Sequence, residues 1–119
     1  MALLSRSTAL DAPDGFACIK IKDGVYAATL TGAITVGPTY PNVCKLDPNG
    51  AHRDVTLDAV ATNAGLVRRF VNAADAAENL VLKNVGGDTI ATVNQNEQGE
   101  VYCDGATWAL LCVTTIALS

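Results

Sequence analysis

The residue best suited to acid-base chemistry in this sequence is its one histidine, His52. It follows a turn and stands close in sequence to Asp47 and Asp54, and a histidine oriented by a carboxylate is a common activator of nucleophiles. A hydrolytic site also needs further groups that converge on the substrate, and nothing flanks His52 in such a pattern. We therefore expect an exposed histidine at the beginning of a strand, no catalytic residues and no enzymatic activity.

The four cysteines are the next candidates, either as metal ligands or as disulfides. They stand at Cys18, Cys44, Cys103 and Cys112, with no Cys-x-x-Cys pair and a single histidine, so a zinc site is not expected. The N-terminus has no secretory pattern, which favours a reducing compartment where cysteines act as small apolar side chains. We expect reduced thiols, with Cys103 and Cys112 on neighbouring strands of a hairpin where a cross-strand contact could form.

Acidic and glycine-rich segments offer little for a metal or a nucleotide. The aspartates that could attract calcium do not have the spacing of a calcium loop, and they are Asp47, Asp54, Asp58, Asp88 and Asp104. Asp47, Asp88 and Asp104 stand beside turn glycines or prolines, where such side chains bond to the local backbone. The glycine pair at 86–87 lacks the lysine and the following helix of a phosphate loop. We expect no metal and no cofactor.

One basic pair and one tryptophan complete the candidates. Arg68 and Arg69 lie in a strand pattern, so they face opposite sides, and we expect one to be solvated and the other paired with a carboxylate or a neighbouring subunit. The chain carries a net charge of -4, which excludes the basic surface that nucleic acid requires. Trp108 begins the last apolar segment, and we expect it to anchor the core with its indole N–H on an acceptor.

The elements that position these residues are short segments of strand character separated by turn sequences. The segments are residues 18–22, 25–30, 34–36, 43–47, 54–57, 67–72, 80–84, 89–93, 100–103 and 108–116. Asp-Gly and Gly-Gly-Asp sequences at 23–24, 86–88 and 104–105 indicate tight reversals between antiparallel strands. Two other stretches, 57–64 and 73–78, predict at most a helical turn each. The prediction is an all-β fold, either an antiparallel β-sandwich or a small β-barrel-like domain.

Length and composition bound the organisation of the chain. Its 119 residues fit one domain, which we assign to residues 16–119, with residues 1–15 as an extended N-terminal arm. Hydrophobic residues make up 50% and charged residues only 17%, so the surface is short of charge and an oligomer is expected. No apolar run approaches the roughly 20 residues that a membrane-spanning helix needs.

Between positions 44 and 111 a series of elements follows in a definite order. It runs through LDPNGAHRDVTL (46–57), GL (65–66), FVNAAD (70–75), ENLVLKN (78–84), GDTIAT (87–92) and VYCDGATW (101–108). These are a DPNG turn, a VTL strand, a strand ending in an asparagine corner, a G-x-T-I hairpin and a Cys-Asp-Gly-x-x-Trp finish. The series covers a little over half of the chain and resembles a β module of tailed-bacteriophage virion proteins, found in head decoration (cement) proteins and in head or tail fibre proteins.

The resemblance implies a structural, non-enzymatic role. The short chain favours a decoration protein, and such proteins commonly sit as homotrimers at local threefold positions of an expanded capsid, which they stabilise. The expected partners are the major capsid protein and further copies of the chain. The protein is expected to be made in the host cytoplasm and to lie on the capsid exterior of the virion. The alternative is a fibre or receptor-binding module that recognises host-surface glycans. Residues 1–43 lie outside the resemblance.

The arm is the part we expect to reach the capsid or a neighbouring protomer, through Leu3, Leu4 and Arg6. These residues are apolar or basic in a segment with no core pattern. Deletion of residues 2–10 is expected to weaken binding to phage heads and to leave the β domain folded, as measured by co-sedimentation and circular dichroism. Unchanged head binding after the deletion would remove these residues from the interface.

Overall fold

The fold is all-β, as the sequence predicts, in a computed structural model that describes residues 24–58 and 64–116. In chain order the strands are β1 (Val25–Thr29), β2 (Ile34–Val36), β3 (Val43–Asp47), β4 (Arg53–Leu57), β5 (Val67–Asn72), β6 (Leu80–Lys83), β7 (Thr89–Val93), β8 (Glu97–Cys103) and β9 (Trp108–Thr115). Within these ranges there is no helix, and hence none that is long and apolar enough to cross a membrane.

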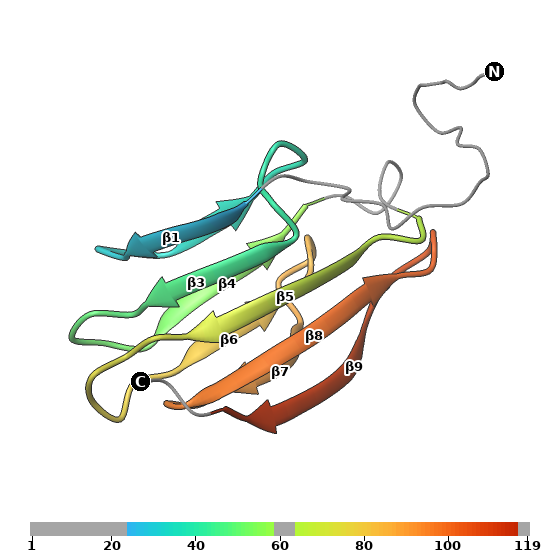
Figure 1. Cartoon of the computed structure of the whole chain (residues 1–119). Coiled ribbons are helices and arrows are strands. Elements are labelled where there is room, and N and C mark those ends of the chain that lie inside the picture. The colour runs from blue at the N-terminus through green and yellow to red at the C-terminus, as the bar shows by residue number, and fades with distance from the viewer. Residues whose placement is uncertain (1–23, 59–63, 117–119) are drawn as a thin grey trace, which may run out of the picture.

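Successive strands alternate between two facing sheets for the first six strands. One sheet has the order β1-β3-β5-β8-β9 and the other the order β2-β4-β6-β7. In this first part each strand pairs in parallel with the strand two places later, so that β1 pairs with β3 and β2 with β4. The chain therefore winds in coils that stack on one another, and the antiparallel strands β7, β8 and β9 complete the two sheets (Figure 1).

The prediction of purely antiparallel pairing is corrected by this topology. β3 and β5 are parallel, as are β4 and β6, because the turn at 47–50 leads the chain across to the facing sheet instead of back beside β3. The reversals at 86–88 and 104–105 form the expected hairpins, β6–β7 and β8–β9, and the one at 23–24 involves residues outside the described part of the chain. Side-chain alternation has the same period of two in both kinds of sheet, so the hydrophobic pattern could not distinguish them.

Several other predictions concern the ends of elements. The strand expected at 18–22, the turn residue Asp23 and the arm at 1–15 lie outside the described residues, as does most of the segment 57–64. The stretch 73–78 forms bends and no helical turn. The strand expected at 100–103 begins earlier, at Glu97.

The core lies between the two sheets and is made by the inward faces of the strands. Its fully buried members include Leu46, Leu57, Phe70, Leu82 and Val101, which come from both sheets. Burial of each such side chain stabilises the fold by about 1.5–3 kcal/mol. The strict in-out alternation, clearest in β5 and β8, is what turns one face of each sheet toward this core.

Gly99 is the point at which β8 leaves room for the opposite sheet. The residue is buried, and a Cβ atom placed on it would lie 2.8 Å from Cγ2 of Val93 and 3.4 Å from Cδ1 of Leu82. Val93 is itself fully buried and has a stiff β-branched side chain, so it cannot move aside cheaply.

Gly99→Ala is therefore expected to destabilise the protein by about 1–3 kcal/mol through overpacking. The measurement is the free energy of unfolding in a chemical denaturant. Gly32→Ala is the matched control, because no atom lies within 4 Å of the added methyl group there. Equal stability of the two variants would show that the sheets are not in tight contact at Gly99.

Candidate functional site

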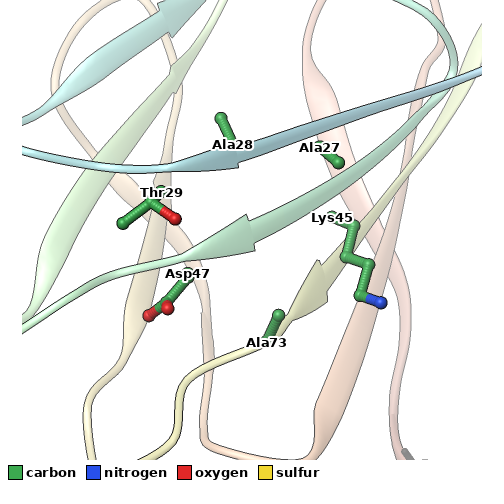
Figure 2. Close-up of a pocket in the computed structure, with 6 residues that line it drawn as sticks. All are labelled: Ala27, Ala28, Thr29, Lys45, Asp47 and Ala73. Atoms are coloured by element: carbon green, nitrogen blue, oxygen red, sulfur yellow. The ribbon is translucent and has the colours of Figure 1, made fainter.

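A shallow hollow lies where three parallel strands of the five-stranded sheet end. Its volume is about 340 Å³, and its lining residues, drawn in Figure 2, are Ala27, Ala28, Thr29, Lys45, Asp47 and Ala73. Thr29 and Asp47 are the last residues of β1 and β3, and Lys45 and Asp47 share the outer face because Leu46 between them is buried. The hollow thus offers small methyl groups bordered by a hydroxyl, an ammonium and a carboxylate. Such a shallow surface is better suited to contact with another molecule than to catalysis, which needs an enclosed site.

The carboxylate of Asp47 lies close to two other carboxylates beside this hollow. One oxygen each of Asp47, Asp75 and Glu78 lie within 4.8 Å of one another, and among the described residues these are the group close enough to share a cation. Sequence reasoning missed this cluster because Asp75 and Glu78 follow β5, and only the parallel pairing of β3 with β5 brings the two ends together. The carboxylates give this end of the sheet a negative potential.

Buried Asn72 shapes the loop that carries Asp75 and Glu78. Its Nδ2 donates to the carbonyl oxygens of Glu78 at 2.8 Å and of Val93 at 2.9 Å, and its Oδ1 accepts the N–H of Ala74 at 2.9 Å. All these bonds satisfy backbone groups that would otherwise be buried without partners. This explains the asparagine that ends β5, which the sequence identified only as a corner.

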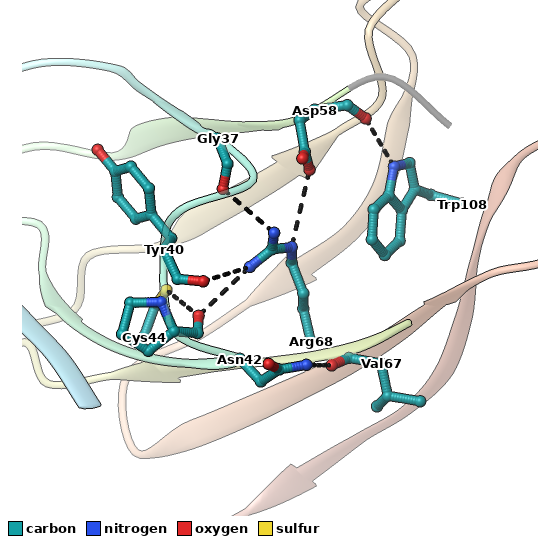
Figure 3. A network of polar contacts seen from close by, with 9 residues as sticks. Gly37, Tyr40, Asn42, Cys44, Asp58, Val67, Arg68 and Trp108 are labelled. Atoms are coloured by element: carbon teal, nitrogen blue, oxygen red, sulfur yellow. Dashed lines mark hydrogen bonds and ion pairs between the residues drawn. The ribbon is translucent and has the colours of Figure 1, made fainter. Parts of the chain in front are cut away.

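Arg68 is fully buried and lies at the centre of a network of polar contacts (Figure 3). Its Nη1 donates to the carbonyl oxygens of Tyr40 at 3.4 Å and Pro41 at 3.3 Å, and its Nη2 donates to Gly37 at 3.2 Å. Its Nε lies 3.7 Å from Oδ1 of Asp58, which forms an ion pair with it. The guanidinium therefore fixes the β2–β3 connection to β5 and to the end of β4.

Trp108 completes this network from the other side. It is 3% exposed, and its indole N–H donates to the carbonyl oxygen of Asp58 at 2.8 Å, so its prediction as a core anchor is confirmed. Arg69 faces outward as expected, and its Nε and Nη2 both lie 2.8 Å from Oε2 of Glu100. The sequence predicts one solvated arginine and one paired arginine. The structure confirms the paired one in Arg68, but the exposed Arg69 is paired as well.

His52 and the turn aspartates have local structural roles. His52 is exposed, and its Nδ1 accepts the N–H of Asn79 at 2.9 Å, which joins the beginnings of β4 and β6. Asp47 accepts the N–H of Asn49 at 2.9 Å. Asp104 accepts two backbone N–H groups, from Ala106 and Thr107, and these bonds lower the pKa of its carboxyl. The expected turn roles of Asp47 and Asp104 are confirmed.

No disulfide joins the three cysteines within the described ranges. Cys44 and Cys103 are fully buried, and burial raises the pKa of the Cys44 thiol to about 11 although Arg68 acts in the opposite direction. A thiol with that pKa stays protonated near neutral pH and is a poor nucleophile. Cys103 and Cys112 lie on the neighbouring strands β8 and β9, as predicted, but they are not opposite each other, because Cys103 lies opposite Trp108 and Cys112 opposite Glu100. Cys18 lies outside the described residues.

The predicted partner-binding residues Leu3, Leu4 and Arg6 also lie outside the described residues. Comparison of the chain with protein families, with curated proteins and with solved structures finds no match. The site must therefore be interpreted from the geometry of this chain alone.

Replacement of Arg68 by methionine is expected to destabilise the protein by about 3–5 kcal/mol, because Asp58 and three partly buried carbonyl groups lose their cationic partner. Arg69→Met is the matched control: that side chain is 48% exposed, and its loss is expected to cost less than about 1 kcal/mol. Chemical denaturation measures both. Similar losses for the two variants would show that the Arg68 network does not fix the loops.

Proposed function

We propose that the chain is a structural virion protein that binds the outer surface of a phage capsid and stabilises it as a decoration protein. In this proposal the protein has no enzymatic activity, its partners are the major capsid protein and further copies of itself, and it acts as a homotrimer on the capsid exterior. The order of turn and strand motifs between positions 44 and 111 supports the proposal, since it resembles the β module of such proteins.

The observation that carries the proposal is where apolar side chains are exposed. Val25 (56%), Val67 (42%), Leu110 (43%) and Leu111 (51%) all lie on strands of the five-stranded sheet, whereas the remaining large one, Val85, lies in the β6–β7 turn. Val25 and Val67 belong to the outer face of this sheet, because Tyr26 and Arg68 beside them face the interior, whereas the two leucines lie on its edge strand β9. Exposed apolar side chains on an outer face are typical of a surface that contacts protein.

The outer face of this sheet has the form of a docking surface. Alternation places Val43 and Val71 on the same face as Lys45 and Arg69, and a second hollow of about 170 Å³ is lined by Asn42, Val43, Val67 and Arg69. The charge of Arg69 is compensated by Glu100, so the area around this second hollow can be covered without burying a lone charge. At the other end of the face, Lys45 and Asp47 border the first hollow and offer charges that a partner can match. An apolar area with a charged border fits another folded protein.

The stabilising mechanism in this proposal is mechanical. Each copy buries apolar surface across an interface between capsid subunits, and this burial stabilises the complex by about 25 cal/mol per Å². The subunits can then separate only if that surface is exposed to water again. Three linked copies bind with higher avidity than one, because the second and third contacts are intramolecular. The rigid two-sheet body suits this role because it transmits load without rearranging.

The test is co-sedimentation of the purified protein with undecorated, expanded heads of the phage that encodes it. We expect saturation at a copy number that matches the threefold positions, and heads that survive heating better. Val67→Lys is expected to weaken binding by about tenfold or more, because it brings an unpaired charge to the docking face. Val85→Lys is the control and is expected to bind normally. Absence of sedimentation with folded protein would overturn the proposal and favour a receptor-binding module.

A further inference from the structure

Strand β9 is an open edge of the five-stranded sheet. In sheet order it comes last, after β8, and within the described part of the chain no strand pairs with its other side (Figure 1). Alternate N–H and C=O groups of an antiparallel edge strand point away from the sheet, ready to pair with another strand. At eight residues, β9 is also the longest strand described.

The composition of β9 leaves this edge without the usual protection. Natural edge strands are kept from pairing by charged side chains, proline or short length, and the sequence WALLCVTT has none of these. By contrast, β2, an edge of the other sheet, has only three residues. A strand of this length and composition is the kind that pairs across an interface.

A register shift brings an additional leucine to the edge. Leu110 lies opposite Val101 and Cys112 opposite Glu100, so Leu111 has no opposing residue in β8. Leu110 and Leu111 are 43% and 51% exposed. A bulge often blunts an edge, but here it adds apolar area at the middle of the strand, which favours burial against a partner.

Charge decides the kind of partner. The chain has a net charge of -4, so most approaches of two copies are repulsive, but β9 carries no charge and the nearby Glu100 is paired with Arg69. A charged foreign strand would gain no ion pair from β9. A second copy offers an uncharged edge strand at the other side of the same sheet, β1 (VYAAT), whose Val25 is exposed. Pairing of β9 with β1 can close a ring of three copies, whereas pairing of β9 with β9 would stop at a dimer.

We propose that the β9 edge pairs with the β1 edge of a second copy of this chain, so that the five-stranded sheet continues from one subunit into the next. The inference rests on the proposed function, because it assigns the self-contact of the proposed assembly to one strand. The capsid is then contacted by the outer face of the sheet, and the copies contact one another by its edge.

Leu111→Lys tests this assignment, with the mass of the full chain measured by analytical ultracentrifugation. We expect an oligomer for the wild type and at least a tenfold weaker association for Leu111→Lys, because a charge without a partner would be brought into an uncharged strand contact. Val85→Lys adds the same charge at another exposed apolar position and is expected to keep the wild-type mass. Circular dichroism confirms that each variant is folded.

Hydrogen exchange gives a second measurement that needs no variant. Half of the amide protons in residues 108–115 point to the open edge, and they are expected to exchange slowly in the oligomer and faster on dilution. A monomeric wild type, an unchanged mass for Leu111→Lys, or fast edge exchange in the oligomer would each overturn the assignment. Head binding by wild-type protein is measured separately, so failure of the capsid proposal is distinguishable from failure of the β9 contact.

Discussion

Strands that follow one another in the first part of the chain lie in different sheets, so none of them can complete its backbone hydrogen bonds with its neighbour in sequence. The partners of β3 are β1 and β5, each reached only after the chain has visited the other sheet. Buried backbone groups must be paired, so every coil depends on the one before it and the one after it. The hollow, the carboxylate cluster and the outer face all exist because coils stack in this register.

The connections between the sheets need their own partners, and Arg68 supplies them. Strand pairing reaches the last residue of the β2–β3 connection, where the carbonyl oxygen of Asn42 accepts the N–H of Arg69. The guanidinium of Arg68 donates to three further carbonyl groups of that connection. Asn72 does the same at the opposite end of β5 for the β5–β6 connection. β5 thus organises both ends of the molecule with two polar side chains directed into an otherwise apolar interior.

Much of the fold follows from local pattern, and the pairing does not. Alternation and turn residues are local signals, and they predict β2, β3, β5 and β7 with their observed bounds. Parallel winding was not predicted, because a turn such as that at 47–50 fits a change of sheet as well as a hairpin. The same reason hid the approach of Asp75 to Asp47. Burial of Arg68 could not be predicted from the pair Arg68-Arg69, since three of its partners are backbone carbonyl groups and the fourth, Asp58, follows a different strand.

The two ends of the coil stack are unlike, and this gives the fold a direction. At the end formed by β7, β8 and β9 the strands turn antiparallel, which ends the repetition, whereas β1 and β2 present the same parallel ladder that every later coil uses. A further coil inserted between β2 and β3 would meet the same kind of neighbours on both sides. Duplication of a coil is therefore compatible with this architecture only in the parallel part of the stack, before β7, β8 and β9. A rod of chosen length could be engineered from this chain by repeating one coil there.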